Sequence, residues 1–288
     1  MMVEIRKVGV VGCGLMGSGI AEVCVRAGLD VLVREVDEAA CRAGRARITV
    51  SLDRGVRGGK LSEQDRAAAL KRLTFTADLG DFTDRQFVVE AIAENEQVKT
   101  EAFRVLDKVV EDDEAIFASN TSAIPIMKLG IATARPEQVI GVHFFNPVPV
   151  LKLVELVPSL LTSEHTQRRA EEFVVGPLSK RIIRSQDRAG FVVNALLVPY
   201  LLSAIRMLES GFASAEDIDS GMVLGCAHPL GPLRLIDLIG LATVKAIAES
   251  MYDEFKQPHY SPPPLLLRMV DAGLLGKKSG HGFYNYSS

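Results

Sequence analysis

The sequence is poor in cysteine and histidine, the residues from which disulfide frameworks and most transition-metal sites are built. It has four cysteines and five histidines among 288 residues. The cysteines stand too far apart for a CxxC redox pair or a zinc knuckle, and a chain of this length does not depend on disulfide bonds; they are Cys13, Cys24, Cys41 and Cys226. We therefore expect reduced thiols, no metal and a cytoplasmic protein.

A long hydrophobic run is also missing. The longest apolar stretch, Phe191–Leu202, has about 12 residues and contains Asn194 and Pro199, whereas a helix that spans a bilayer needs about 20. The start of the chain, Met1–Lys7, lacks the basic and apolar blocks of a signal peptide. These features predict a buried helix at Phe191–Leu202 and no association with a membrane.

Neither sign of charge is in excess, because 33 lysines and arginines face 36 aspartates and glutamates. The formal net charge of -3 gives no global reason to bind nucleic acid, so an anionic ligand must be held by local groups. Hydrophobic residues make up 48% and charged residues 24% of the chain, which excludes a disordered, collagenous or coiled-coil protein. The length suggests about two domains or one large one.

Two regions follow each other along the chain. Up to about Arg184, short β-branched runs alternate with helical segments, which predicts a parallel, doubly wound sheet; the runs are Val8–Val11, Val31–Val33, Phe87–Val89, Ala115–Ala118, Val139–Val142 and Leu153–Val157. Beyond Gly190 the pattern is helical; the segments are Phe191 onward, Ala215–Leu224, Pro232–Tyr252 and Pro264–Ala272. We expect an α/β Rossmann-type, mostly parallel sheet domain over 1–188 and an all-helical domain over 189–288.

Two segments stand apart from this pattern. Ala39–Ala69 is polar and rich in arginine, and its glycines predict two helical pieces that extend from the sheet. The tail, Leu275–Tyr286, combines glycines with three aromatic residues, Phe283, Tyr284 and Tyr286. Because a mobile terminus has little use for aromatic side chains, we expect the tail to pack on the protein.

A glycine-rich turn follows the first expected strand and opens a helix. Its first glycine makes the tight turn, its second lets the backbone approach a pyrophosphate, and its third lets helix and strand pack closely. The free N–H groups and the dipole of the helix N-terminus then face the phosphates. This arrangement predicts a dinucleotide site; its residues are Gly12, Cys13, Gly14, Leu15, Met16 and Gly17.

An acidic residue, Glu35, closes the second expected strand 18 residues after Gly17. A carboxylate at this place accepts hydrogen bonds from ribose hydroxyls and repels a 2′-phosphate, so it predicts NAD rather than NADP. The neighbouring Arg34 could instead pair with a 2′-phosphate. Since side chains alternate along a strand, we expect Arg34 to face away from the ribose.

The chemistry is expected where later strands end, because an open α/β sheet binds its ligands at that edge. Ser119–Ser122 follows one strand and could serve merely as a helix cap. His143 ends the next strand and by itself could equally be a core histidine. Glu155 shares a strand face with apolar residues and needs a partner there. An antiparallel return could place it beside His143, and such a pair makes a competent general base.

Together these residues resemble the L-3-hydroxyacyl-CoA dehydrogenase family, and most closely its bacterial 3-hydroxybutyryl-CoA dehydrogenases. The resemblance runs from about Val8 to Tyr286, and its segments occur in the family's order. They are Gly12–Ala21, Val89–Asn95, Ser119–Ser122, His143–Pro149 with Lys152–Glu155, Gly190–Asn194, His228–Pro232 and Lys278–Tyr284.

The resemblance implies a role for each matched residue. His143 is the base, Glu155 orients it, and Ser122 and Asn194 bind the reacting oxygens. The family's contacts to the nicotinamide half of NAD fall on Glu94, Lys99, Asn146 and Lys278.

For coenzyme A the family uses a serine, which matches Ser51, and a lysine, whose position is Gly58 here. Lys60, Arg57 or Arg54 could supply that charge. The family also implies a homodimer through the helical domain, where Leu196, Leu197, Leu201 and Leu202 offer an apolar face.

Two other functions fit parts of the pattern. The gulonate dehydrogenase and lambda-crystallin relatives share the nucleotide loop and a His–Glu pair, although Lys152 and the Asn194 segment favour an acyl-CoA substrate. A noncatalytic protein of the same fold would have lost the reactive residues, yet Ser122, His143, Glu155 and Asn194 are all present.

Overall fold

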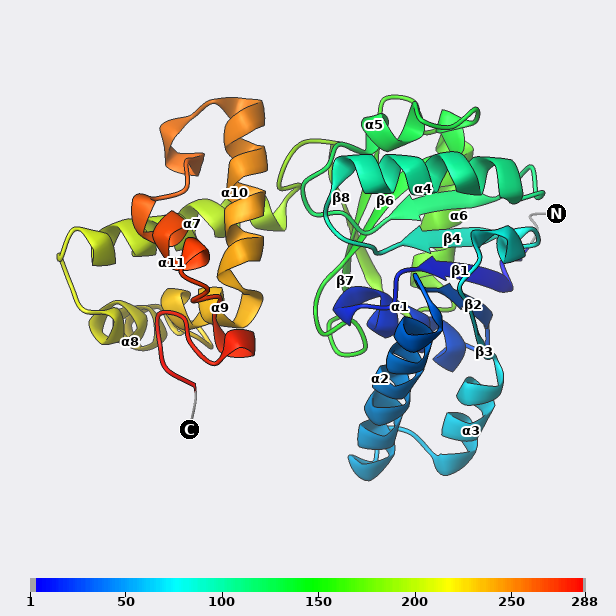
Figure 1. Ribbon diagram of the computed structural model, residues 1–288, viewed down its shortest axis with the longest axis horizontal. Coiled ribbons are helices and arrows are strands. Elements are labelled where there is room, and N and C mark those ends of the chain that lie inside the picture. Colours follow the sequence, from blue (N-terminus) through cyan, green and yellow to red (C-terminus); the bar gives the residue numbers. More distant parts are fainter. Residues whose placement is uncertain (1–3, 287–288) are drawn as a thin grey trace. The chain divides into compact units, whose positions relative to one another are not determined.

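The computed structural model describes residues 4–286 and contains two compact units. One unit ends at Asp187 and the other begins at Arg188 (Figure 1). The first is built on a mostly parallel sheet with helices on it, and the second is helical. The predicted fold class is thus confirmed.

The sheet has eight strands within the described residues, in the order β3-β2-β1-β4-β5-β6-β7-β8. Neighbouring strands are parallel except β6 and β7, which are antiparallel. The strands are β1 (Lys7–Val11), β2 (Asp30–Arg34), β3 (Leu73–Thr76), β4 (Phe87–Glu90), β5 (Ile116–Ser119), β6 (Val139–Phe144), β7 (Leu153–Pro158) and β8 (Arg181–Arg184). The helices are α1 (Leu15–Arg26), α2 (Glu38–Arg57), α3 (Glu63–Lys71), α4 (Glu96–Val109), α5 (Ile126–Gly130) and α6 (Glu164–Val175).

The central strands are buried on both faces, as their β-branched runs require. Phe87 and Val89 of β4 enter one apolar core with residues of α1 and α6, where Phe87 stacks on Phe173. Val88, which lies between them, points to the other face and is also buried. Such burial stabilises the fold by about 25 cal/mol for each Å² of apolar surface taken from water.

The two outermost strands, β3 and β8, have no counterpart among the expected strands. Their sequences, LTFT and RIIR, are short, and all of their residues except Leu73 are partly buried or exposed. Edge strands need no continuous apolar run, because one side of the ladder and part of their faces remain exposed. The pattern that identifies a buried parallel strand therefore does not apply to them.

The polar segment after β2 forms two helices, as expected. α2 ends at Arg57, and α3 begins at Glu63 after a break that contains Gly58 and Gly59. Asp37 caps α2 by accepting a hydrogen bond from the Ala40 N–H at 2.7 Å. Figure 1 shows α2 extending well beyond the strands to which it is joined.

The C-terminal unit consists of helices α7 (Val193–Glu209), α8 (Ala215–Cys226), α9 (Pro232–Ile239), α10 (Leu241–Phe255) and α11 (Pro264–Asp271). The single helix expected over Pro232–Tyr252 is two helices, because Gly240 has a φ of +103° that a helix cannot accommodate. Leu201 and Leu202 lie wholly in this unit's own core, so the idea that they form a dimer face is wrong. Leu196, in contrast, is 75% exposed.

The C-terminal tail packs on its unit as expected, and a buried aspartate of α9 holds it. The carboxylate of Asp237, which is 1% exposed, accepts hydrogen bonds from the N–H groups of Phe283 (2.8 Å) and Tyr284 (3.0 Å). It also accepts one from the Tyr286 hydroxyl at 3.1 Å. The Tyr284 hydroxyl donates to Asp219, which in turn caps the N-terminus of α9.

The tail makes stability sensitive to alkaline pH. Burial and the adjacent Asp237 carboxylate raise the pKa of Tyr286 to about 12. A phenol whose pKa is higher in the folded protein than the ordinary value of about 10 loses its stabilising contribution as pH rises between the two values. We expect the melting temperature to fall between about pH 10 and pH 12 and the fall to be smaller in Tyr286→Phe. An equal fall in both proteins would contradict this assignment.

Within residues 4–286, every helix is too short or too polar to cross a membrane.

Candidate active site

The glycine-rich turn has the shape that a pyrophosphate requires. Gly12 has a φ of +89°, which favours glycine, and a Cβ on Gly17 would lie 1.9 Å from the Gly12 carbonyl oxygen. At Gly14, in contrast, no neighbouring heavy atom lies within 4 Å of the position that a Cβ would take. Helix α1 begins at Leu15, directly after this opening. The turn therefore fits a phosphate group at the helix N-terminus.

Glu35 is fixed beside this turn. Its carboxylate accepts hydrogen bonds from the N–H groups of Cys13 and of Val36, the latter at 3.2 Å. Burial and the negative charge of the nearby Glu35 carboxylate raise the pKa of the Cys13 thiol to about 12, so the thiol stays neutral. Arg34 donates instead to the Ala77 carbonyl oxygen at 3.3 Å, just after the end of β3.

A histidine and a glutamate meet across the antiparallel pair β6–β7. His143 lies directly opposite Glu155 in the strand register, and its Nδ1 is 2.7 Å from Glu155 Oε2. Glu155 is 0% exposed and His143 4% exposed. A buried carboxylate so placed accepts the Nδ1–H hydrogen bond and leaves the lone pair on Nε2. The structure thus brings together the two residues that strand alternation had suggested.

Ser122 completes this group from the neighbouring strand end. It follows β5, which is parallel to β6, and its Oγ lies 2.9 Å from His143 Nε2. Glu94 holds the backbone here, because its Oε1 accepts hydrogen bonds from the N–H groups of Ser122 (2.9 Å) and Ala123 (3.1 Å). Thr121 donates its hydroxyl to the same oxygen. Glu94 itself is about one-third exposed, so it borders the site.

Lys99, in contrast, is not at the surface. Its side chain is 1% exposed, and Nζ lies 2.6 Å from Glu90 Oε1 and 3.2 Å from Glu94 Oε2. Glu90 is 0% exposed and was not among the predicted site residues, because a glutamate at the end of a strand looks like an ordinary terminal charge. The predicted contact between Lys99 and the cofactor stays a prediction.

A cavity of about 570 Å³ lies between α1, α2 and the loop that joins β6 to β7. Ser51 and Asn146 both border it, as does Arg54, whereas Lys60 does not. Lys180, 7% exposed, holds the loop by donating to the carbonyl oxygens of Val148 and Leu151. Arg47 also borders the cavity and donates to the Cys13 carbonyl oxygen. Neither Arg47 nor Lys180 has a sequence signal of its own.

The remaining predicted site residues belong to the C-terminal unit. Asn194 lies in the first turn of α7 and is 9% exposed. Lys278 lies in a short 3-10 helix, Lys277–Ser279, and is exposed. Their roles toward the reacting oxygens and the cofactor stay predictions.

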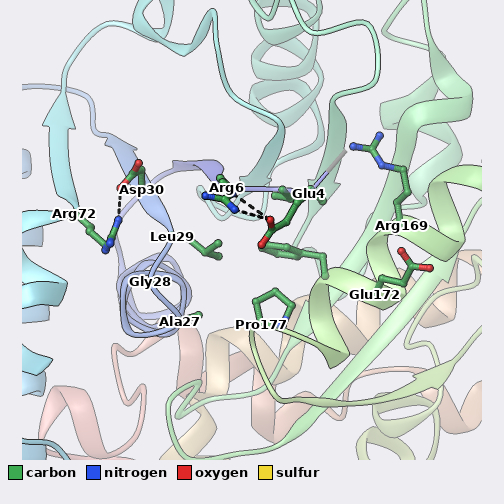
Figure 2. A pocket seen from close by; sticks show the side chains of 12 residues that line it. Glu4, Arg6, Ala27, Gly28, Leu29, Asp30, Arg72, Arg169, Glu172 and Pro177 are labelled. Carbon is green, nitrogen blue, oxygen red and sulfur yellow. Dashed lines mark hydrogen bonds and ion pairs between the residues drawn. The ribbon is translucent and has the colours of Figure 1, made fainter. Parts of the chain in front are cut away.

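A second cavity, of about 620 Å³, lies at the opposite edge of the sheet, where β1, β2 and β3 begin. Figure 2 shows that its charged side chains pair with each other, Arg6 with Glu4 and Arg72 with Asp30. Arg169 and Glu172 add one charge of each sign. Because these charges cancel, the cavity offers no selective site for an anion. Among the described residues no group of three or more His, Cys, Asp or Glu side chains is placed to hold a metal ion.

A dinucleotide turn at the end of β1 and a His–Glu–Ser group on later strands of the same sheet define a nicotinamide-dependent oxidoreductase. Comparison with known proteins agrees. The chain matches the model of the 3-hydroxyacyl-CoA dehydrogenase NAD-binding domain over residues 7–188 and that of the C-terminal domain over residues 190–286. The chain belongs to the 3-hydroxyacyl-CoA dehydrogenase family.

Individual relatives span the whole chain. A 3-hydroxybutyryl-CoA dehydrogenase of Mycobacterium tuberculosis is 62% identical over 98% of this chain and 99% of the relative. The crystal structure of FadB2 from M. tuberculosis has a TM-score of 0.97 and 61% identity, covering 99% of this chain and all (100%) of that one. The crystal structure of (S)-3-hydroxybutyryl-CoA dehydrogenase PaaH1 from Ralstonia eutropha has a TM-score of 0.92 and 45% identity, with coverage of 99% and 100%.

Proposed function

We propose that this oxidoreductase interconverts (S)-3-hydroxybutyryl-CoA and acetoacetyl-CoA with NAD as the cofactor. The observation that carries the proposal is the buried contact of 2.7 Å between His143 Nδ1 and Glu155 Oε2, with Ser122 Oγ 2.9 Å from Nε2. Full-length similarity to proteins named 3-hydroxybutyryl-CoA dehydrogenase supports the choice of substrate.

His143 acts as the general base in the oxidation. Its Nε2 accepts the proton of the 3-hydroxyl group as the C3–O bond becomes a carbonyl. A bound nicotinamide would supply the acceptor for the hydride that leaves C3. Glu155 holds the ring in one tautomer and stabilises the imidazolium that results, which is where the proton stays until it is exchanged with solvent.

Ser122 is a hydrogen-bond partner for the reacting oxygen. Its hydroxyl already lies at Nε2, so a substrate oxygen placed between the two can contact both groups. Asn194 is the second such partner in this proposal. A positioned donor stabilises the negative charge that develops on the carbonyl oxygen when the reaction runs in the reducing direction.

Glu35 supports NAD over NADP. Two backbone N–H groups fix its carboxylate at the turn. There it can accept hydrogen bonds from the ribose hydroxyls, and it would repel a 2′-phosphate. Arg34 is turned to Ala77, so it is not arranged to neutralise such a phosphate. The residues assigned to the nicotinamide half are Glu94, Lys99, Asn146 and Lys278.

Arg54 best replaces the basic residue that is missing at Gly58. It lies one helical turn after Ser51 on α2, borders the same cavity and, within the described residues, forms no ion pair. A guanidinium there can bind a phosphate of coenzyme A through two parallel hydrogen bonds. Lys60 is exposed and lies outside the cavity lining.

We expect Arg54→Gln to raise the KM for acetoacetyl-CoA about tenfold, the effect of losing one charge-assisted contact at the surface. The kcat and the KM for NADH should not change. Acetoacetyl-pantetheine, which lacks the nucleotide phosphates, should react equally with both proteins. Lys60→Gln is the matched comparison, and a larger rise in KM for that variant would transfer the role to Lys60.

The substrate class is tested by comparing rates with acetoacetyl-CoA and with gulonate, each with the appropriate form of NAD and of NADP. Our proposal expects turnover of acetoacetyl-CoA with NADH and a much lower rate with NADPH. A higher kcat/KM for gulonate would instead place the protein with the gulonate dehydrogenases. No turnover of any acyl-CoA would revive a noncatalytic role.

A homodimer formed through the C-terminal unit is part of the proposal. That unit leaves large apolar side chains at its surface, among them Leu196 (75% exposed), Phe212 (79%) and Leu224 (85%). Large apolar side chains at a surface are typical of association sites. Sedimentation should show twice the monomer mass, and a species of monomer mass alone would contradict the dimer.

A further inference from the structure

The N-terminal unit contains a buried ion pair that takes no part in the proton and hydride transfers of the proposed reaction. Glu90 ends β4 and is 0% exposed, Lys99 lies in the first turns of α4 and is 1% exposed, and Nζ is 2.6 Å from Oε1. Removing two charges from water is so costly that a buried pair is often no more stable than apolar residues of the same volume. Stability of the core alone therefore does not explain why charges are found here.

Lys99 is linked through a second carboxylate, Glu94, to the loop that follows β5 and carries Ser122. Its Nζ is 3.2 Å from Glu94 Oε2. Oε1 of the same carboxylate accepts hydrogen bonds from the N–H groups of Ser122 and Ala123, at 2.9 and 3.1 Å. One oxygen of Glu94 thus faces the lysine and the other faces the loop. The lysine thereby fixes the orientation of the group that holds Ser122.

Glu90 reaches the start of the same loop. Its Oε2 accepts the Ser119 hydroxyl at 2.6 Å, and Ser119 Oγ accepts the Thr121 N–H at 3.2 Å. The pair therefore contacts the loop before Ser122 through Ser119 and at Ser122 itself through Glu94. Both routes end at the serine whose Oγ is 2.9 Å from His143 Nε2.

We propose that Glu90 and Lys99 are positioning residues that hold Ser122 at hydrogen-bond distance from the base. This inference rests on the proposed function, because it assigns Ser122 a place in that reaction. Lys99 acts on Ser122 through Glu94. A displacement of about 1 Å at a reacting group lowers the rate about a hundredfold, which gives such positioning a large effect on turnover.

The test uses the double variant Glu90→Gln with Lys99→Met in the full-length protein. The exchange removes both charges together, so no uncompensated ion remains in the core. The glutamine side chain retains an oxygen for the Ile92 N–H and an amide for Ser119, and the methionine side chain preserves most of the volume of the lysine. The matched control is Arg169→Met, which removes a cation that is also buried, at 5% exposure, but at the opposite edge of the sheet.

Two measurements separate positioning from a purely structural role. Steady-state kinetics at saturating NADH should show kcat for acetoacetyl-CoA reduced about a hundredfold. Amide hydrogen exchange should show faster exchange in residues 121–124 and unchanged exchange in β4 and α4. Arg169→Met should leave both kcat and the exchange of residues 121–124 unaltered.

The possible results are distinct. Unchanged kcat and unchanged exchange at residues 121–124 in the folded double variant would overturn the proposal, and so would faster exchange throughout the unit. If the double variant does not fold, Glu90→Gln alone, which keeps the Ser119 and Ile92 contacts, is measured in the same way and with the same criteria. If the unaltered protein lacks acyl-CoA activity, the proposed function fails, while the exchange measurement still decides whether the pair holds the loop.

Discussion

Replacement of His143 by glutamine should lower kcat for acetoacetyl-CoA reduction about a thousandfold, within the range that general acid–base groups contribute. The reason is chemical, because the glutamine amide can still bond to Glu155 and Ser122 but cannot accept or return a proton near neutral pH. NADH binding should stay near normal, since the nucleotide turn and Glu35 follow β1 and β2 rather than β6. Rates from NADH absorbance and affinities from fluorescence titration check the two expectations.

The chain offers a matched control for this variant. His165 also forms a His–Glu pair, with Nε2 2.8 Å from Glu114 Oε2, but both side chains are about half-exposed. His165→Gln should therefore leave kcat unchanged. Full activity of His143→Gln would refute the assignment of the base, and equal losses in both histidine variants would indicate a general loss of structure.

Replacement of Asp237 by alanine should destabilise the C-terminal unit by about 3 kcal/mol, because it removes three hydrogen bonds to a buried carboxylate and leaves two tail N–H groups without their partner. Asp237→Asn should lose less, since its amide oxygen can still accept one or two of these bonds. Denaturant unfolding followed by circular dichroism measures the difference in free energy of unfolding.

Asp253 provides the comparison on the same unit. Its carboxylate pairs with Lys256 at 2.9 Å, and both side chains are largely exposed. A surface pair of this kind contributes between 0 and about 1 kcal/mol, so Asp253→Ala should change stability little. If Asp237→Ala were no less stable than Asp253→Ala, the carboxylate would not be what holds the tail.

The fold could be predicted as far as burial governs it. β1, β4, β5 and β6 are covered on both faces, and their uninterrupted apolar runs made them recognisable. β3 and β8 lie at the two edges, where a sequence such as LTFT or RIIR meets the local demands without such a run. The break at Gly240 was missed for a different reason, since the flanking helices keep a continuous apolar periodicity across it.

The site could be predicted where strand geometry alone sets it. Alternation along β7 put Glu155 on an apolar face, and the antiparallel turn brought it to His143. The contacts of Glu90 and Lys99 could not be anticipated in the same way, because they join side chains of β4, α4 and β5. Those of Asp237 could not either, because they join α9 to tail residues that lie 46 and 47 positions away in the sequence. Likewise, periodicity marked Leu201 and Leu202 as apolar without indicating whether they face the unit's own core or its surface.

The pairing of His143 with Glu155 by strand register has a consequence for variation. The register is fixed by the ladder between β6 and β7 and by their buried faces, so the connecting segment 145–152 can change in sequence without moving His143 from its carboxylate partner. That same segment carries Asn146 and three further residues that border the cavity beside Ser51 and Arg54. In the proposed reaction, proton transfer and ligand selection are thereby separated on one hairpin, so that selectivity can change, or be engineered, while the chemistry is kept.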